Sequence, residues 1–454
     1  MRQTENYWRD RALAVEAALL ARMPENKLRP RLEPTRRAVE LLVNPQQSFR
    51  VIHVTGTNGK TSTTRFIERI LREHGLRTGR FTSPHLISLN ERIAIDGEPV
   101  EDEALAMAWQ ELEPFLQIVD DELAAAGEPA LTYFEALTVL GFTVFADAPI
   151  DVLALEVGMG GEWDSTNVAD GDVAVFTPIS LDHVERLGHS LEEIATTKSG
   201  IIKPAARVII GHQRPEAQAI LSSKANAIAD ASYAINEHFE VLEVENLGTA
   251  QRFSIRGLAG VYSDLVMPVL GEFQVENAAV AIAAVEAFMG DAQVRIADDI
   301  LRVAMADLSS PGRLQVVSRN PTVILDAAHN PAGATVLSHE MRSLFSASKV
   351  HGVVAILADK DADGVLAQFA EFMTDVVVTQ SSSPRSHEVG ALAELAAKPF
   401  GETRVSIEAN FAKALASATE QASTEPGSVV LVTGSISLLA DVLKLQNEKE
   451  ADDA

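Results

Sequence analysis

The stretch from residue 51 to residue 62, Val-Ile-His-Val-Thr-Gly-Thr-Asn-Gly-Lys-Thr-Ser, constrains the fold of this chain more than any other. A β-branched apolar run meets a glycine turn, and Gly-Lys-Thr-Ser then opens an amphipathic segment. This order predicts a strand, a phosphate-binding loop and a helix. The backbone N–H groups of such a loop and the positive end of the helix dipole favour a polyphosphate. Lys60 reaches its outer phosphates, and the hydroxyl of Thr61 or Ser62 can ligate Mg²⁺.

The match to the phosphate-loop pattern is imperfect. The pattern GxxxxGK[ST] requires glycine at position 54, where this chain has Val54. An ordinary glycine turn between a strand and a helix is therefore the alternative interpretation, because short motifs also occur by chance. The motifs that follow along the chain weigh against this alternative.

The composition narrows the class of protein. A chain of 454 residues is too long for one hydrophobic core and indicates two or three domains. A net charge of −26 disfavours binding to nucleic acid or to an anionic membrane, so a phosphate site must be a local positive island. The absence of cysteine excludes disulfides and thiolate chemistry and fits a cytoplasmic location. We find neither a signal-peptide core nor a run of about 18 apolar residues that would predict a membrane span.

The first half of the chain has the rhythm of an α/β domain. Short β-branched runs alternate with helical patterns, which predicts a mostly parallel sheet covered by helices. The expected strands are 50–54, 78–82, 151–156, 173–177 and 207–210. Segment 233–270 is richer in strand formers and turns and predicts a small antiparallel patch, followed by helices at 276–289 and 294–306.

The sequence Ser-Ser-Pro-Gly at 309–312 marks the expected domain boundary. Beyond it the alternation restarts, which predicts a second, Rossmann-like α/β domain. Its expected strands are 322–325, 352–357, 375–379 and 428–432, and its expected helices are 331–345, 362–372, 388–398, 409–421 and 435–446. The predicted domains are thus 1–310 and 311–446, with an acidic tail at 447–454.

Polar residues follow several expected strands of the first domain. Ser83 comes directly after one strand and is a possible metal ligand, although this segment taken alone favours a strand-ending turn. Glu156 ends a buried strand, where a carboxylate is costly unless it meets a cation such as Mg²⁺. The glycines after it do not form a dinucleotide motif, because GxGxxG would need glycine at position 163, which is Trp163. His183 follows the strand expected at 173–177, and a lone His is more often structural than a metal ligand. Lys198 is a further candidate, although most lysines are solvated surface charges.

The second half adds an Arg, an Asp and a His near the domain junction. Arg313 follows the Pro-Gly break, and Asp326 and His329 lie between an expected strand and helix. An Arg and an Asp at such a junction can close over a nucleotide that is bound to the first domain, because clefts between domains are favoured ligand sites.

Taken together and in this order, these motifs resemble the folylpolyglutamate synthase and dihydrofolate synthase family of the Mur ligase superfamily. The resemblance runs from about residue 25 to 440. It is carried by TGTNGKTS (55–62), TSPHL (82–86), LTYFEALT (131–138), LEVGMGG with DSTN (155–167), DHVERLG (182–188), SPGRLQ (310–315) and DAAHNPAG (326–333). It implies an ATP-binding central domain and a C-terminal glutamate-ligase domain.

The resemblance implies an ATP-dependent ligase that joins L-glutamate to a carboxylate through an acyl phosphate. The positions that match its nucleotide contacts are Thr57, Asn58, Gly59, Lys60, Thr61, Asn277, Arg313 and Asp326. Those that match its ligands for two Mg²⁺ ions are Ser83, Glu156, His183 and Lys198, the last as a carbamylated lysine. Lys60, Lys198 and His329 are the expected catalytic residues, with His329 a possible base for the glutamate amine.

The pterin-side positions are Thr132, Phe134 and Asp164, with Leu28–Pro30 as weaker candidates. This set favours a bifunctional enzyme that acts on dihydropteroate as well as folate, and a monofunctional folylpolyglutamate synthase is the alternative. A Mur-type ligase for UDP-sugars is disfavoured, since the segment of about fifty residues before Gly56 is too short for a UDP-binding domain. A nucleotide-dependent switch would not need the second metal set. The family is typically monomeric, and we expect a monomer.

The chain departs from the usual family pattern at several positions. Glu162 stands where Arg is usual, and Phe273 replaces a His. Thr197 and Ser199 flank Lys198 where Glu and Ala are common. Arg29 takes a position that is often acidic in bifunctional members, which bears on pterin recognition.

Overall fold

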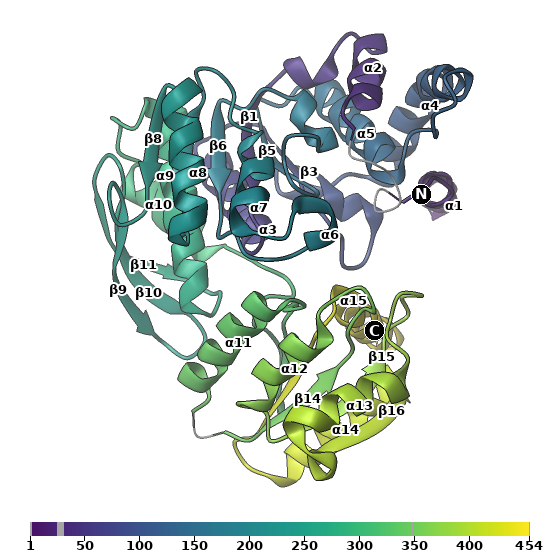
Figure 1. The fold of residues 1–454 in the computed structure, drawn as a ribbon, viewed down its shortest axis with the longest axis vertical. Helices are drawn as coiled ribbons and strands as arrows, with labels where there is room; N and C mark the ends of the chain where they lie inside the picture. Colours follow the sequence, from purple (N-terminus) through teal and green to yellow (C-terminus); the bar gives the residue numbers. More distant parts are fainter. Residues whose placement is uncertain (1, 25–30, 347, 454) are drawn as a thin grey trace. The chain divides into compact units, whose positions relative to one another are not determined.

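The computed structural model describes residues 2–24, 31–346 and 348–453 (Figure 1). Within it the chain forms two compact units. The first comprises Met1–Val244, Phe253–Met267 and Val275–Leu308, and the second comprises Glu245–Arg252, Pro268–Gln274 and Ser309–Ala454. Each unit contains a largely parallel sheet with helices packed on it, so the predicted α/β fold class is confirmed.

The large sheet of the first unit has the order β4-β3-β2-β5-β1-β6-β7-β8 among the described residues. The six strands β2, β5, β1, β6, β7 and β8 pair in parallel. Strands β3 and β4 pair antiparallel at the edge of the sheet next to β2. The strands are β1 (Arg50–Thr55), β2 (Thr78–Phe81), β3 (Ile93–Ile95), β4 (Glu98–Pro99), β5 (Val152–Glu156), β6 (Val173–Phe176), β7 (Arg207–Ile210) and β8 (Ala231–Ala234).

The five strands predicted for this sheet are confirmed. The sequence missed β3 and β4, because strands of two or three residues are too short to show an alternating pattern. The start of the predicted antiparallel patch was wrong, since β8 pairs in parallel with β7 and belongs to the large sheet.

The helices of the first unit are α1 (Arg2–Leu20), α2 (Glu33–Leu41), α3 (Lys60–Glu73), α4 (Asp102–Ala125), α5 (Tyr133–Asp147), α6 (Val184–Leu187), α7 (Leu191–Ser199), α8 (Pro215–Ile228), α9 (Glu272–Gly290) and α10 (Asp298–Ala306). The short 3₁₀ helices are η2 (Pro45–Gln47), η3 (Leu89–Arg92) and η4 (Ser165–Val168). None of the helices in the described part of the chain combines the length and apolar character that crossing a membrane requires.

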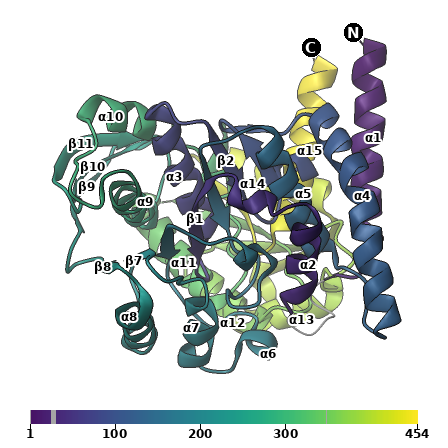
Figure 2. The same cartoon turned by 90° about the horizontal axis from the view of Figure 1, so that it is seen from above.

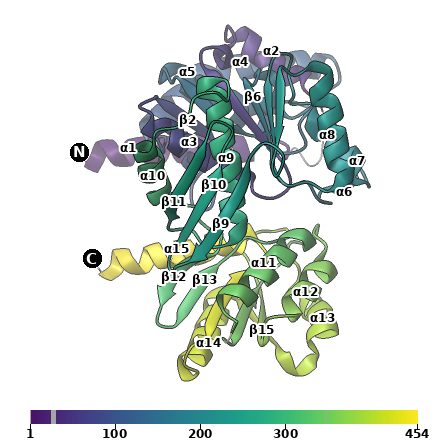
Figure 3. The same cartoon turned by 90° about the vertical axis from the view of Figure 1, so that its left-hand side faces the viewer.

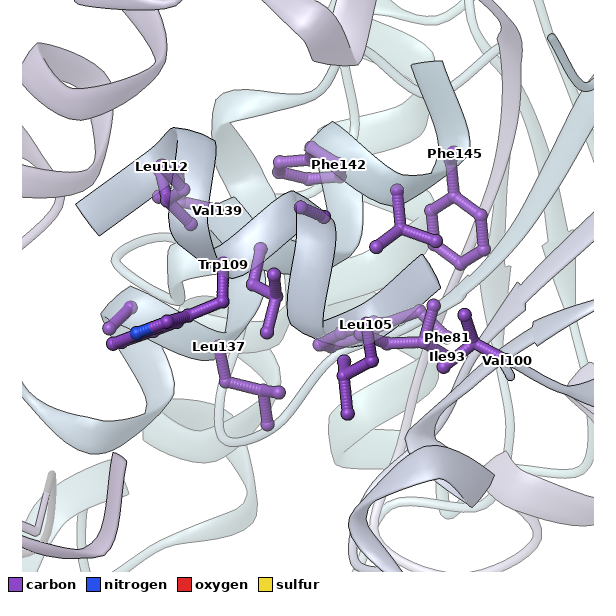
Figure 4. Close-up of a cluster of buried hydrophobic side chains, with 14 of the residues drawn as sticks. Phe81, Ile93, Val100, Leu105, Trp109, Leu112, Leu137, Val139, Phe142 and Phe145 are labelled. Atoms are coloured by element: carbon purple, nitrogen blue, oxygen red, sulfur yellow. The ribbon is translucent and has the colours of Figure 1, made fainter. Parts of the chain in front are cut away.

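The main core of the first unit lies between helices and one face of the large sheet. Figure 4 shows side chains of α4 (Leu105, Trp109 and Leu112) and of α5 (Leu137, Phe142 and Phe145) in one apolar cluster. Helix α1 runs alongside α4 and adds apolar side chains to the same cluster (Figure 2). Burying each large apolar side chain contributes about 1.5–3 kcal/mol, so this cluster is a major source of stability for the sheet that carries the site.

A three-stranded sheet follows the large one, in the order β11-β10-β9 within the described chain (Figure 3). Its strands are β9 (Glu240–Asn246), β10 (Gln251–Arg256) and β11 (Val261–Met267). Four-residue connections join the strands, and connections this short require antiparallel neighbours. The predicted antiparallel patch is therefore present, and α10 packs against its β11.

In the second unit the strand order is β12-β13-β17-β14-β15-β16 over the described residues, with β12 antiparallel and the rest parallel. The elements are β12 (Gln315–Arg319), β13 (Thr322–Leu325), α11 (Pro331–Leu344), β14 (Val350–Val354), α12 (Ala362–Ala370), β15 (Asp375–Gln380), α13 (Val389–Phe400), η5 (Glu402–Arg404), β16 (Val405–Asn410), α14 (Phe411–Thr424), β17 (Val429–Thr433) and α15 (Ile436–Asp453).

The sequence missed β12 and β16, which are the two edge strands of this sheet. Edge strands carry polar side chains, and none of the residues of β12 or β16 is fully buried, so their pattern does not stand out. Helix α15 runs to Asp453, so most of the predicted acidic tail at 447–454 continues this helix.

A buried carboxylate fastens the small sheet to α9. Glu286 of α9 accepts hydrogen bonds from the hydroxyl of Tyr262 (2.7 Å) and from the N–H groups of Leu258 (2.6 Å) and Ala259 (3.1 Å). The Tyr262 oxygen in turn accepts the N–H of Ile296 at 2.9 Å. Burial raises the pKa of Glu286 above its usual range, and the hydrogen bonds from Tyr262 and the two amides oppose that rise.

We expect Glu286→Ala to lower the free energy of unfolding of the first unit by about 3 kcal/mol, because the buried hydroxyl of Tyr262 and two half-buried amide N–H groups lose their acceptor. Urea denaturation followed by tryptophan fluorescence measures this loss, since Trp8, Trp109 and Trp163 all lie in the first unit. Glu243→Ala, at an exposed position of β9, is the matched control. Equal stability of the two variants would contradict the structural role of Glu286.

Candidate functional site

The phosphate-binding loop lies between the end of β1 and the start of α3. Gly59 has φ +87°, and a Cβ atom there would lie 2.6 Å from Oδ1 of Asn277 on α9. Gly56 has φ +153°, and a Cβ there would lie 1.9 Å from Oγ1 of Thr177. Both positions require glycine. The predicted nucleotide contact Asn277 therefore lies directly against the predicted phosphate loop.

Two further contacts fix the loop. The hydroxyl of Thr57 donates to the carbonyl oxygen of Ser180 and accepts the N–H of the same residue, both at 3.0 Å. Lys60 folds back over the loop and its Nζ donates to the carbonyl oxygens of Gly56 and Thr57, both at 3.2 Å. The lysine thus lies over the loop whose N–H groups form the expected phosphate cradle.

A buried carboxylate lies beside this loop. Glu156 ends β5, pairs with Val54 of β1 in the parallel register, and is 1% exposed. Its carboxylate accepts the hydroxyl of Thr61 at 2.9 and 3.1 Å and the N–H of Ser83 at 3.2 Å. The structure therefore brings the predicted metal ligands Ser83 and Glu156 together with Thr61, all of which offer the oxygen atoms that Mg²⁺ prefers.

Lys198 of α7 also reaches the phosphate loop. It is 3% exposed, and its Nζ donates to the carbonyl oxygen of Gly56 at 2.7 Å. Burial and the charge of Lys60 lower the pKa of Lys198, the charges of Asp182 and Asp164 act in the opposite direction, and the resulting pKa is about 7. In a large fraction of the molecules the amine of Lys198 is therefore neutral near pH 7.

His183 is less buried than the other predicted ligands. It has φ +51° at the start of α6, its side chain is 38% exposed, and its Nε2 lies 4.0 Å from a carboxylate oxygen of Asp182. Within the described residues, no three His, Asp or Glu side chains gather as a ready-made metal cluster.

The three predicted pterin contacts have structural roles of their own. The hydroxyl of Thr132 caps α5 by accepting the N–H of Glu135 at 3.2 Å, and the Glu135 carboxylate accepts the N–H of Thr132 at 2.7 Å. Phe134 packs so closely on Gly158 that a Cβ there would lie 2.5 Å from its ring. Asp164 is 4% exposed and caps η4. Phe134 and Asp164 thus both contact the glycine-rich loop 157–163 that follows Glu156.

The Asp164 carboxylate is linked through Thr166 to His53, which was not among the predicted site residues. Its oxygens accept the N–H groups of Met159 (2.8 Å) and Thr166 (3.0 Å) and the Thr166 hydroxyl. That hydroxyl lies 2.9 Å from Nε2 of His53, which is fully buried in β1. The one polar side chain in the apolar run 51–54 was the available signal for His53.

In the second unit, Arg313, Asp326 and His329 lie close together. Asp326 is 5% exposed and accepts the N–H groups of Leu314 (3.0 Å) and Ala328 (2.9 Å). Burial raises its pKa, and the neighbouring Arg313 charge opposes that rise. His329 Nδ1 lies 2.8 Å from the carbonyl oxygen of Ala327, which makes Nδ1 the protonated nitrogen and leaves Nε2 as a possible base.

The departures from the family pattern have different consequences. The Glu162 side chain is exposed, and its backbone N–H donates to the carbonyl of Thr197 at 2.9 Å, so the missing Arg leaves this loop contact intact. Phe273 packs against the core of the second unit. Arg29 and the segment Leu28–Pro30 lie outside the described residues.

Comparison with known proteins identifies the family of this chain. The Mur ligase middle domain matches residues 54–285, and the Mur ligase glutamate ligase domain matches residues 312–436. The dihydrofolate synthase/folylpolyglutamate synthase of Mycobacterium tuberculosis is 41% identical over 446 residues, covering 93% of this chain and 91% of that protein. The chain belongs to the dihydrofolate synthase/folylpolyglutamate synthase family.

Solved structures of this family have the same fold. Folylpolyglutamate synthase of M. tuberculosis complexed with ADP and AMPPCP gives a TM-score of 0.91 at 40% identity, covering 96% of this chain and 98% of that one. E. coli FolC in complex with DHPP and ADP gives 0.83 at 28% identity, covering 97% and 98%. This protein is therefore an ATP-dependent glutamate ligase that acts on small molecules. Its predicted phosphate loop lies within the matched Mur ligase middle domain.

We expect Gly59→Ala to weaken ADP binding about tenfold, because an alanine is strained in the left-handed backbone conformation of this position and its methyl group collides with Asn277. Isothermal titration calorimetry with ADP measures the effect. Gly75→Ala is a matched control, since Gly75 has a similar φ of +82° with no atom within 4 Å of its Cβ position. Unchanged ADP affinity in Gly59→Ala would contradict the placement of the nucleotide.

His53 predicts a pH dependence of stability. Burial and, to a smaller extent, the charge of Lys203 lower its pKa to about 3. Below pH 6.5 the unfolded chain therefore takes up a proton that the folded chain refuses, so stability falls as the pH falls. At pH 5 the expected loss is about 2 kcal/mol.

The measurement is the urea unfolding free energy of the first unit at pH 7 and pH 5. His53→Gln keeps an N–H donor but cannot titrate, so we expect its stability to fall by about 2 kcal/mol less over this range. His212→Gln, at an exposed position in the same unit, is the control. The same pH dependence in His53→Gln and in the unsubstituted protein would refute a neutral, buried His53.

Proposed function

We propose that this enzyme adds L-glutamate both to dihydropteroate and to reduced folates. In the reaction a substrate carboxylate oxygen attacks the γ-phosphorus of ATP, the bond to the β-phosphate oxygen breaks, and ADP leaves. The glutamate nitrogen then attacks the acyl carbon, the carbon–oxygen bond to phosphate breaks, and the amine proton passes to a base. The observation that carries the proposal is the convergence of Lys60, Lys198 and the buried Glu156 carboxylate on one phosphate-binding loop.

The residues beside the loop fit a magnesium ion. Glu156 offers a buried carboxylate, and Thr61 and Ser83 hold it by a hydroxyl and an amide N–H. These two hydroxyl side chains and the carboxylate form an oxygen-rich ligand set. Mg²⁺ bound there would neutralise charge on the phosphoryl oxygens. Lys60 supports the same task, since its ammonium group already lies over the loop.

A second Mg²⁺ fits if Lys198 is carbamylated. The neutral amine nitrogen attacks the carbon of CO₂, a nitrogen–carbon bond forms, one carbon–oxygen π pair moves onto oxygen, and the proton leaves the nitrogen for solvent. The pKa of about 7 supports this step, because only the neutral amine reacts. The product is an anionic oxygen ligand, which together with His183 would complete the site.

The second unit would supply the remaining groups. Arg313 is positively charged and Asp326 is fixed by two backbone N–H groups, which suits contacts to the nucleotide. The hydrogen bond from Nδ1 of His329 to Ala327 leaves Nε2 as the acceptor, so we propose His329 as the base for the glutamate amine.

The choice of acceptor is the finer part of the proposal. Thr132, Phe134 and Asp164 support use of dihydropteroate, and the M. tuberculosis and Bacillus subtilis relatives carry both activities in their names. The Lacticaseibacillus casei relative, 35% identical over 420 residues, is named folylpolyglutamate synthase alone. A monofunctional enzyme is therefore the alternative. We further propose that the enzyme is a cytoplasmic monomer without nucleic-acid or membrane partners, consistent with its net charge of −26.

The test is ADP release by the purified full chain with Mg²⁺, ATP and L-glutamate, run in parallel with dihydropteroate and with a reduced monoglutamyl folate. Release with both acceptors supports the bifunctional enzyme. Release with the folate alone establishes the monofunctional alternative. No release with either acceptor would overturn the folate assignment. Sedimentation at a mass near 48.8 kDa tests the monomer.

We expect Lys198→Ala to lower the rate of ADP release by about 100-fold, because the second anionic ligand is lost. Added acetate or formate restores part of the rate, since a small carboxylate can occupy the place of the carbamate. Lys224→Ala, at an exposed position of α8, is the control. Full activity of Lys198→Ala without added carboxylate would refute the carbamate.

A further inference from the structure

Three buried polar side chains form a line from β1 to the loop after β5. His53 and Thr166 are 0% exposed and Asp164 is 4% exposed. Burying polar groups costs free energy unless they bind one another, and apolar residues would fill the same space without that cost. Packing alone therefore does not explain why these three buried positions are polar.

The direction of its hydrogen bonds follows from the Asp164 carboxylate. The Thr166 hydroxyl donates to Asp164, so its oxygen is left to accept the N–H of His53 Nε2 at 2.9 Å. His53 is thereby a neutral donor, and its Nδ1 has no hydrogen-bond partner within the described residues. All of the polar bonding of this side chain in that part of the chain goes to Thr166.

Asp164 transmits this restraint to the glycine-rich loop 157–163. It accepts the N–H of Met159 at 2.8 Å, and the carbonyl of the next residue, Gly160, accepts the Thr55 hydroxyl at 2.8 Å. The loop is thus tied at neighbouring positions to β1, once through His53 and once through Thr55.

At Gly161 and Gly200 the loop and the end of α7 approach each other so closely that a side chain would not fit. A Cβ at Gly161 would lie 2.6 Å from the carbonyl oxygen of Lys198, and a Cβ at Gly200 would lie 2.4 Å from Cα of Glu162. The side chain of Asn167 donates to the carbonyls of Glu162 (2.9 Å) and Gly200 (3.2 Å), bridging the two segments. No flexible side chain cushions the contacts at the two glycines, so a shift of the loop moves Lys198.

We propose that His53 and Thr166 are positioning residues for Lys198: through Asp164 they hold the loop 157–163 against the end of α7 that carries this lysine. This chain of contacts begins and ends on the same segment, because Nζ of Lys198 donates to the carbonyl oxygen of Gly56, three residues after His53. The place of Lys198 relative to the phosphate loop is therefore fixed from two sides. This inference rests on the proposed function for the assignment of Lys198 to the metal site.

The test is ¹³C NMR of the purified full chain with ¹³C-labelled bicarbonate, in which the signal absent from Lys198→Ala reports the carbamate. In Thr166→Val we expect the bicarbonate concentration for half-occupancy to rise about tenfold. Thr166→Ser restores the hydroxyl and the affinity. ADP affinity stays within about twofold of that of the unsubstituted protein in both variants, which shows that they fold.

Thr138→Val is the matched control. Thr138 is a buried threonine of α5 whose hydroxyl has no partner among the described residues, so its loss leaves the carbamate unchanged. Unchanged half-occupancy in Thr166→Val would overturn the positioning role.

A second measurement separates this inference from the proposed function. If the unsubstituted protein shows no carbamate signal, the carbamate of the proposed function fails by itself. The ¹³Cε signal of Lys198, recorded without bicarbonate, then decides the positioning role. A shift of that signal in Thr166→Val but not in Thr138→Val supports it, and the same signal in all three proteins refutes it.

Discussion

The amino groups of Lys60 and Lys198 both donate to one carbonyl oxygen, that of Gly56, and the phosphate loop of the first unit is arranged around this contact. Two unit charges a few ångströms apart repel each other by an energy on the order of 4 kcal/mol at a protein-like dielectric. Burial of Lys198 adds to that cost, and both effects lower its pKa to about 7. Two kinds of negative charge would relieve the repulsion between the two lysines. One is a triphosphate bound beside Lys60, and the other is a carbamate formed on Lys198. In a chain of net charge −26, this contact is the local positive island that an anionic substrate requires.

The large sheet explains how distant residues reach this point. Strand β1 lies between β5 and β6, and all three run in parallel, so their carboxyl ends meet at one edge. Thr55, Glu156 and Phe176 end these strands, and the segments after them supply the phosphate loop, the glycine-rich loop and the carbonyls that hold Thr57. Chemistry at this edge follows from the topology, while the helices on the sheet supply its stability.

Sequence reasoning succeeded where a short segment carries its own signal. The phosphate loop, the buried strand ending in Glu156 and the parallel alternation are local patterns. It missed β3, β4, β12 and β16, which are short or lie at sheet edges and show no clear period. It also missed the bond between His53 and Thr166, which are 113 residues apart. A hydrogen bond formed by tertiary packing leaves no mark on either segment alone.

The glycines of the loop 157–163 illustrate how one sequence signal serves different structures. The run Gly-Met-Gly-Gly fails as a dinucleotide motif because position 163 is Trp163. In the structure these glycines allow close approach of protein to protein: Gly158 to the ring of Phe134, Gly161 to the backbone of Lys198. A side chain at either place would separate the loop from α5 or from α7. In a dinucleotide motif the missing Cβ makes room for a pyrophosphate. Here it lets the loop pack directly against α5 and α7, and no flexible side chain separates the loop from the backbone of Lys198.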